Sequence, residues 1–74
     1  MMTEKQIELI EETYDCFARY TAQGNIWFYR YKDKKPLVWY NSIENRFNCY
    51  FSEYSILWLS DKEFFKRLKL LAFE

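Results

Sequence analysis

Apolar side chains at the start of the chain recur at spacings of three and four residues, which is the period of an amphipathic α-helix. Acidic residues lie mostly on the other side of this pattern. Thr3 and Gln6 have the spacing of a capping box, which marks a helix start, and Gly24 is suited to end a helix in the left-handed conformation. The sequence therefore predicts a helix over residues 3–23, with the apolar stripe Ile7, Ile10, Tyr14, Phe17 and Tyr20 or Thr21.

The middle of the chain changes to an alternating pattern rich in aromatic and β-branched residues, which is typical of β-strands. Turn-forming stretches at 33–36 and 41–45 divide it. Strands are therefore predicted over 26–32, 37–40 and 46–51.

The C-terminal part of the chain returns to the helical period. Ser60 and Glu63 repeat the capping-box spacing and predict a second helix start. Residues 56–59, just before it, are predicted as a short fourth strand, with an apolar linker packed under the last helix as the alternative. The apolar stripe of the predicted helix is Phe64, Leu68 and Leu71.

These patterns together predict one domain, residues 1–74, of the α+β class. We expect an antiparallel β-meander of three or four strands, with an N-terminal and a C-terminal helix packed on one face. At 74 residues the chain is close to the lower size at which a hydrophobic core alone stabilises a fold, so no second domain is expected.

The predicted third strand has the clearest alternation and assigns the two faces of the sheet. Its apolar set belongs in the core, because burying Arg46 and Asn48 without partners would be costly. Carried across the sheet, this assignment predicts Phe28, Phe47 and Phe51 as core residues. The outward face then holds the predicted binding residues, which are the aromatic side chains Trp27, Tyr29, Tyr31, Trp39 and Tyr50 and the basic rim Lys34, Lys35 and Arg46.

The composition agrees with an exposed aromatic face. Hydrophobic residues make up 50% of the chain and aromatic residues 23%, more than so small a core encloses. The net charge is zero, but residues 1–24 hold five acidic and two basic residues, and residues 25–51 hold the reverse. We interpret these segments as solvated faces that help the first helix dock on the sheet, with an anion-facing sheet as the alternative.

The candidate chemistry excludes the common catalytic arrangements. The chain has no histidine, which removes Ser-His and Cys-His pairs, and one glycine, which leaves no phosphate-binding loop. Cys16 and Cys49 lack the spacing of a zinc site, so we expect no enzyme activity, metal or cofactor, and a reactive cysteine is a minor alternative. Because no signal peptide and no apolar run of membrane length is visible, we expect a cytoplasmic protein with reduced thiols and no membrane contact.

Tyr, Trp and Arg are the residues enriched at protein interfaces. We therefore expect a small interaction module that binds another protein or a second copy of itself, as an inhibitor, adaptor or chaperone-like protein of the kind that phages and plasmids encode. The alternative is a single-stranded nucleic-acid-binding protein that uses the same face, since aromatic platforms and cations serve that function too. The neutral net charge favours the first interpretation.

The predicted order of helix, three strands and helix resembles the layout of double-stranded RNA-binding domains. That family carries a Gly-Pro-x-His loop between its first two strands and a lysine cluster at the start of its last helix. Here the loop reads Asp33-Lys34-Lys35-Pro36, and the last helix opens with Ser60-Asp61-Lys62-Glu63. The resemblance is confined to the layout and implies no function.

Overall fold

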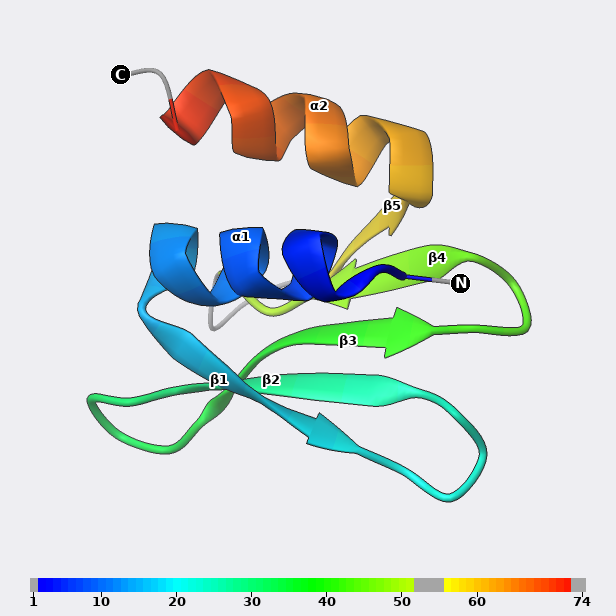
Figure 1. Ribbon diagram of the computed structural model, residues 1–74, viewed down its shortest axis with the longest axis horizontal. Coiled ribbons are helices and arrows are strands. Elements are labelled where there is room, and N and C mark those ends of the chain that lie inside the picture. The colour runs from blue at the N-terminus through cyan, green and yellow to red at the C-terminus, as the bar shows by residue number, and fades with distance from the viewer. Residues whose placement is uncertain (1, 52–55, 73–74) are drawn as a thin grey trace.

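The structure is a computed structural model that describes residues 2–51 and 56–72, with side chains up to Lys69. It consists of helices at both ends and a five-stranded antiparallel sheet between them, whose strands lie side by side in chain order (Figure 1). The α+β class and the meander are confirmed, and the sheet gains a first strand that the hydrophobic pattern does not predict. The elements are α1 (Glu4–Tyr14), β1 (Cys16–Tyr20), β2 (Ile26–Arg30), β3 (Pro36–Asn41), β4 (Arg46–Cys49), β5 (Leu57–Ser60) and α2 (Asp61–Ala72).

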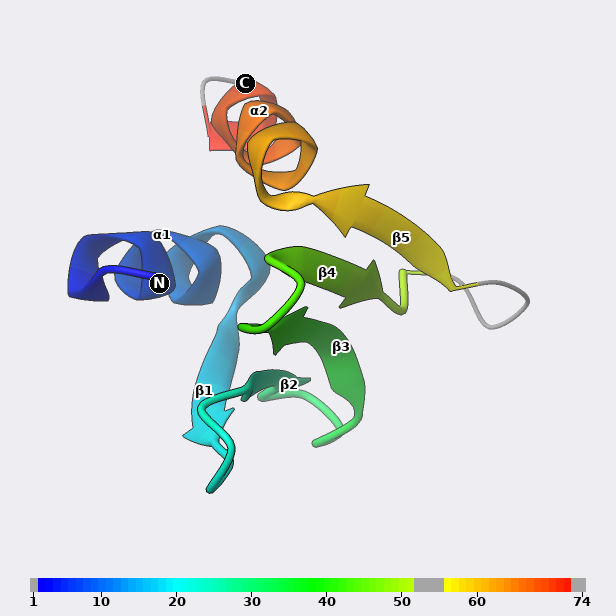
Figure 2. The ribbon, with the colours of Figure 1, turned by 90° about the vertical axis from the view of Figure 1, so that its right-hand side faces the viewer.

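Both helices lie on one face of the twisted sheet, and the described residues leave the other face uncovered (Figure 2). α1 packs on β1, and α2 packs on β4 and β5. Neither helix, within the part of the chain that the structure describes, has the length and apolar character needed to cross a membrane.

The first helix is shorter than predicted, because it ends at Tyr14 rather than near Gln23. Its start is as predicted: Gln6 N–H donates to Thr3 Oγ1 at 3.2 Å, and Thr3 N–H donates to Gln6 Oε1 at 2.9 Å. Asp15 then adopts the left-handed conformation, at φ 51° and ψ 60°, and its N–H donates to the Glu11 carbonyl. A residue in this conformation closes a helix, and Asp is among the few residues that tolerate it.

Residues 16–20, predicted as helix, form strand β1 instead. β1 pairs along its whole length with β2, from Cys16 opposite Arg30 to Tyr20 opposite Ile26. Gly24, predicted to end the helix, lies in the turn between these strands at φ 82°. The helical spacing of Phe17 and its neighbours fits an alternating strand equally well, so pairing with β2 decides their structure.

The core lies between the helices and the near face of the sheet. Phe28 and Phe47 are fully buried, as predicted, and Phe47 stacks on Phe64 of α2 with ring centroids 3.9 Å apart. Ile10 of α1 and Leu68 of α2 are also fully buried. Side chains that point to this face therefore point towards the helices, and their neighbours along each strand point away from them.

The alternation predicts Phe51 in the core, but this prediction is wrong, because the residue is 41% exposed. β4 ends at Cys49, so the alternation that would have buried Phe51 stops before it reaches this residue. Its ring packs at the margin of the core, 5.4 Å from the ring of Tyr14. The fourth predicted strand is confirmed as β5, and the predicted contribution of Leu71 to the helix stripe lies outside the described side chains.

Candidate interaction surface

One row of side chains crosses the whole sheet on the side away from the helices. Directly paired residues of antiparallel strands point to the same face. Trp27 pairs with Trp39, Trp39 with Asn48, and Asn48 with Trp58, while Arg19 extends the row to β1 opposite Trp27. The row therefore contains every tryptophan of the chain. We call this uncovered side of the sheet the aromatic face.

The rings of the aromatic face pack on one another around Trp27. The centroid of Trp27 lies 5.5 Å from that of Trp39, 6.2 Å from that of Tyr29 and 6.1 Å from that of Tyr50, with ring planes 24–25° apart. These separations are in the favourable range for offset stacking. Because the rings touch, Trp27 and its three neighbours are half-buried and form one continuous apolar surface.

Three of the remaining predicted residues, Tyr31, Lys34 and Lys35, lie at one end of this stack, and Arg46 lies on β4. Tyr31, in the turn between β2 and β3, is 51% exposed, and its ring lies 5.1 Å from Phe17. Lys34 reaches the same rings. Lys35 is exposed in the turn, where its backbone N–H donates to Asp33 Oδ1 at 3.1 Å. The structure thus brings Lys34 to the rings and leaves Lys35 at the edge.

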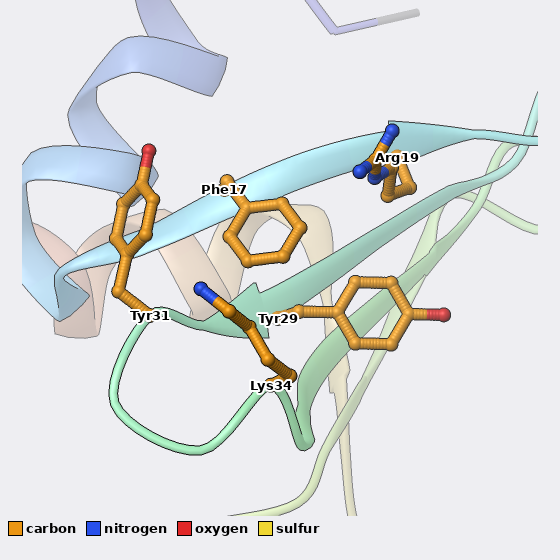
Figure 3. A pocket seen from close by; sticks show the side chains of 5 residues that line it. All are labelled: Phe17, Arg19, Tyr29, Tyr31 and Lys34. Atoms are coloured by element: carbon orange, nitrogen blue, oxygen red, sulfur yellow. The ribbon is translucent and has the colours of Figure 1, made fainter.

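Three cations lie over rings of the aromatic face. Lys34 Nζ is 5.2 Å from the centre of the Phe17 ring and 5.3 Å from that of Tyr31 (Figure 3). Arg19 Cζ is 5.5 Å from the Phe17 ring centre, and Arg46 Cζ is 5.4 Å from the Trp58 ring. Such contacts stabilise an exposed cation by about 0.5–1 kcal/mol each.

The charge balance on this face is one-sided. The five strands contain arginines but no Asp or Glu. The nearby Asp33 carboxylate is taken by Arg30, whose Nε donates to Asp33 Oδ1 at 3.1 Å, and this bond is the main cause that lowers the pKa of Asp33. Lys34, Arg19 and Arg46 take part in no ion pair within the described residues. The face therefore presents positive charge on an apolar surface.

An open hollow of about 680 Å³ is lined by two of these cations, Lys34 and Arg19. Its floor is formed by the rings of Phe17 and Tyr29, whose centroids are 5.7 Å apart, and the Lys34 ammonium group points into it between Phe17 and Tyr31 (Figure 3). Arg19 borders its far end. The hollow has the composition of a site for an anionic group attached to an apolar or aromatic body.

Sequence reasoning missed Phe17, Arg19 and Trp58 as members of this surface. Phe17 and Arg19 were assigned to the first helix, although their alternation with Cys16 and Ala18 already fits a strand. Trp58 lay in a segment whose strand register could not be derived, and the pairing of β5 with β4 places it beside Asn48.

Two buried polar atoms near the centre of the face lack a partner among the described residues. They are Nε1 of Trp39 and Oδ1 of Asn48, which belong to directly paired residues. Asn48 is only 4% exposed. A buried polar atom without a partner costs about 1–3 kcal/mol, which makes Asn48 a poor choice for stability alone.

The cysteines offer no reactive thiolate. Both are free and buried, and burial raises the pKa of Cys16 to about 11 and that of Cys49 to about 12. Within residues 2–51 and 56–72 there is no group of His, Cys, Asp or Glu side chains that could hold a metal ion. The aromatic face is therefore the candidate functional site.

Comparison with protein-family models, with curated proteins and with solved structures finds no match for this chain. The function is inferred from the surface alone.

Proposed function

We propose that the protein is a small interaction module that binds a partner protein through its aromatic face. The observation that carries the proposal is the row of Trp27, Trp39 and Trp58, which crosses a sheet face that no described helix covers. Trp and Tyr bury large areas with little loss of side-chain entropy, and with Arg they supply most interface hot spots.

The arrangement of the rings favours a protein as the binding partner over a nucleic acid whose bases stack separately on the rings. Trp27 is stacked against three neighbours, so the ring faces it shares with them are not free to receive a base. What the centre of the face offers is a broad apolar surface of the kind that a partner's apolar side chains cover.

The charges define the complementary partner. A surface that meets Arg19, Lys34 and Arg46 gains from carboxylates at matching positions. Two copies of this chain docked face to face would bring these cations together, which opposes a homodimer through this face. The partner is therefore a different protein with an apolar patch bordered by acidic residues, and the module acts on it as an inhibitor, adaptor or chaperone-like subunit. The same proposal places it in the reducing cytoplasm, in keeping with its free, buried thiols.

Exposed members of the face give the sharpest test. A variant with Tyr31→Ser, Trp58→Ser and Arg19→Glu removes two exposed rings and reverses one charge, yet leaves the Trp27 stack in place. Ile43→Ser is the matched control, because Ile43 is 83% exposed but lies in the turn between β3 and β4. Photo-crosslinking from position 35 in the source cell, followed by mass spectrometry, identifies the partner and its contact region, because Lys35 is exposed beside the face and none of these substitutions changes it.

We expect the wild type and Ile43→Ser to capture the same protein at an acidic and apolar region, and the triple variant to lose it. Circular dichroism must show that the triple variant is folded. Equal capture by all three proteins, or a crosslinked region without acidic residues, would refute the proposal.

The hollow beside Lys34 favours a second candidate, a single-stranded nucleic-acid-binding protein. Phe17 and Tyr29 form an aromatic floor and two cations border it, as in sites that stack a base and hold its phosphate. Titration with a fluorescent dodecathymidylate at low salt tests this idea. Three phosphate contacts, from Arg19, Lys34 and Arg46, predict a slope of log K against log salt of about −2. Absence of binding at low salt eliminates this candidate and leaves the protein-binding proposal intact.

A further inference from the structure

Strand β1 is an edge of the sheet, and its outer side has backbone groups that no other strand satisfies. Tyr31 N–H donates to the Asp15 carbonyl at 3.3 Å, and Thr21 N–H donates to the Asn25 carbonyl at 2.9 Å. These bonds at both ends of β1 show that the odd-numbered residues are bonded to β2. The N–H and C=O groups of Cys16, Ala18 and Tyr20 therefore face the free edge.

A side chain of α1 occupies the middle of this edge. Glu11 Oε2 accepts a hydrogen bond from the Ala18 N–H at 3.2 Å. Glu11 lies in the last turn of α1, and the left-handed Asp15 turns the chain back so that β1 runs beside the helix end. A carboxylate at this position protects the edge strand, because an unpaired N–H at a sheet edge can form a hydrogen bond with a strand of another chain.

We propose that the free edge of β1 is a pairing surface for a second copy of this chain, and that the Glu11 carboxylate blocks it. Antiparallel pairing of two β1 strands around Ala18 is symmetric, and it sets the Phe17 of each copy opposite the Arg19 of the other. Within one chain these two side chains already form a cation–π contact. Ala18, at the two-fold axis, has the smallest side chain of the strand and lets the copies approach.

Glu11 opposes this pairing in two ways. It occupies the N–H that the second strand would bond at the axis, and it places a negative charge there in both copies, which repel each other. The hydrogen bonds of the edge pairing use backbone groups in the plane of the sheet, whereas the proposed partner binding uses side chains of the aromatic face.

Glu11→Ala tests the proposal by removing both obstacles. Sedimentation equilibrium of the full chain from 5 to 500 μM compares this variant with the wild type and with Glu8→Ala. Glu8 is an exposed glutamate of the same helix, so its substitution changes the charge equally. We expect the dimer dissociation constant of Glu11→Ala to be at least about tenfold lower than that of the other two proteins. Its solution mass should approach twice that of the wild type as the concentration rises.

Two further measurements tie the association to β1. Adding Ala18→Pro to Glu11→Ala removes the edge N–H without removing a bond to β2, and should return the mass to that of the wild type. Amide exchange at Ala18, measured below the association threshold, should be faster in Glu11→Ala than in the wild type. An unchanged mass for Glu11→Ala, or association that survives Ala18→Pro, would overturn the proposal, and unchanged exchange would show that Glu11 does not protect the edge.

Discussion

Trp27 is expected to contribute to the stability of the fold as well as to its surface. Its ring stacks on Trp39, Tyr29 and Tyr50, and an aromatic pair contributes about 0.5–1.5 kcal/mol beyond the burial of area. Trp27→Ser therefore loses about 1.5–4.5 kcal/mol from ring contacts alone. A chain of this length has a free energy of unfolding of about 4–11 kcal/mol, so the loss is a large fraction of the total.

Trp58 provides the matched comparison within the same row. It is 51% exposed, and its described ring contact is the one with Arg46. Such an exposed cation–π contact contributes about 0.5–1 kcal/mol, so Trp58→Ser should lose no more than about 1 kcal/mol of unfolding free energy from ring contacts. The two substitutions exchange the same residue types and differ mainly in the surroundings of the ring.

Urea unfolding followed by far-ultraviolet circular dichroism measures the difference, since tryptophan fluorescence is itself changed by both substitutions. We expect Trp27→Ser to unfold at a lower midpoint urea concentration than Trp58→Ser, with the same slope of unfolding free energy against urea concentration. If Trp27→Ser costs no more than Trp58→Ser, the stack does not stabilise the sheet. Trp27 would then be a better residue than Trp58 for testing partner binding.

Further predictions concern the buried polar atom, the thiols and the turn glycine. Asn48→Leu should raise the free energy of unfolding by about 1–3 kcal/mol, because it removes a buried oxygen that has no partner among the described residues, and a lower value by urea unfolding would contradict this. In the folded protein the pKa of the Cys16 thiol rises from 9.0 to about 11 and that of the Cys49 thiol to about 12. The stability that these neutral thiols contribute is therefore complete below pH 9 and is lost as the pH rises towards the two folded-state values. Thermal unfolding measured across this pH range tests the prediction. Gly24→Ala should lower the free energy of unfolding by about 1–2 kcal/mol, because alanine disfavours the positive φ of this position. The added Cβ would not clash, since its contact with Ser42 Oγ at 3.6 Å is an ordinary one.

Local sequence signals identify the starts of both helices and the strands of the central meander. The capping box of Thr3 and Gln6 forms as its spacing predicts, and Ser60 Oγ accepts from Glu63 N–H at 3.3 Å. The alternation around Phe47 also assigns the faces of the sheet correctly for Phe28. These features are predictable because they depend on neighbours three or four residues away, or on the two-residue period of a strand.

The tertiary structure decides the features that two distant segments share. Residues 16–20 fit a helix and a strand equally well by pattern, and only pairing with β2 selects the strand. Phe51 follows the apolar alternation of β4 but lies beyond the end of the strand and is partly exposed.

The aromatic face shows the same division. That its aromatic residues turn outward follows from alternation in the sequence. The row that joins the three tryptophans to Arg19 depends on the registers of four strand pairs. A shift of one residue in any pair would break the row, and no local sequence pattern specifies these registers. The sequence by itself therefore determines which residues are available for the surface, and the strand registers decide which of them meet.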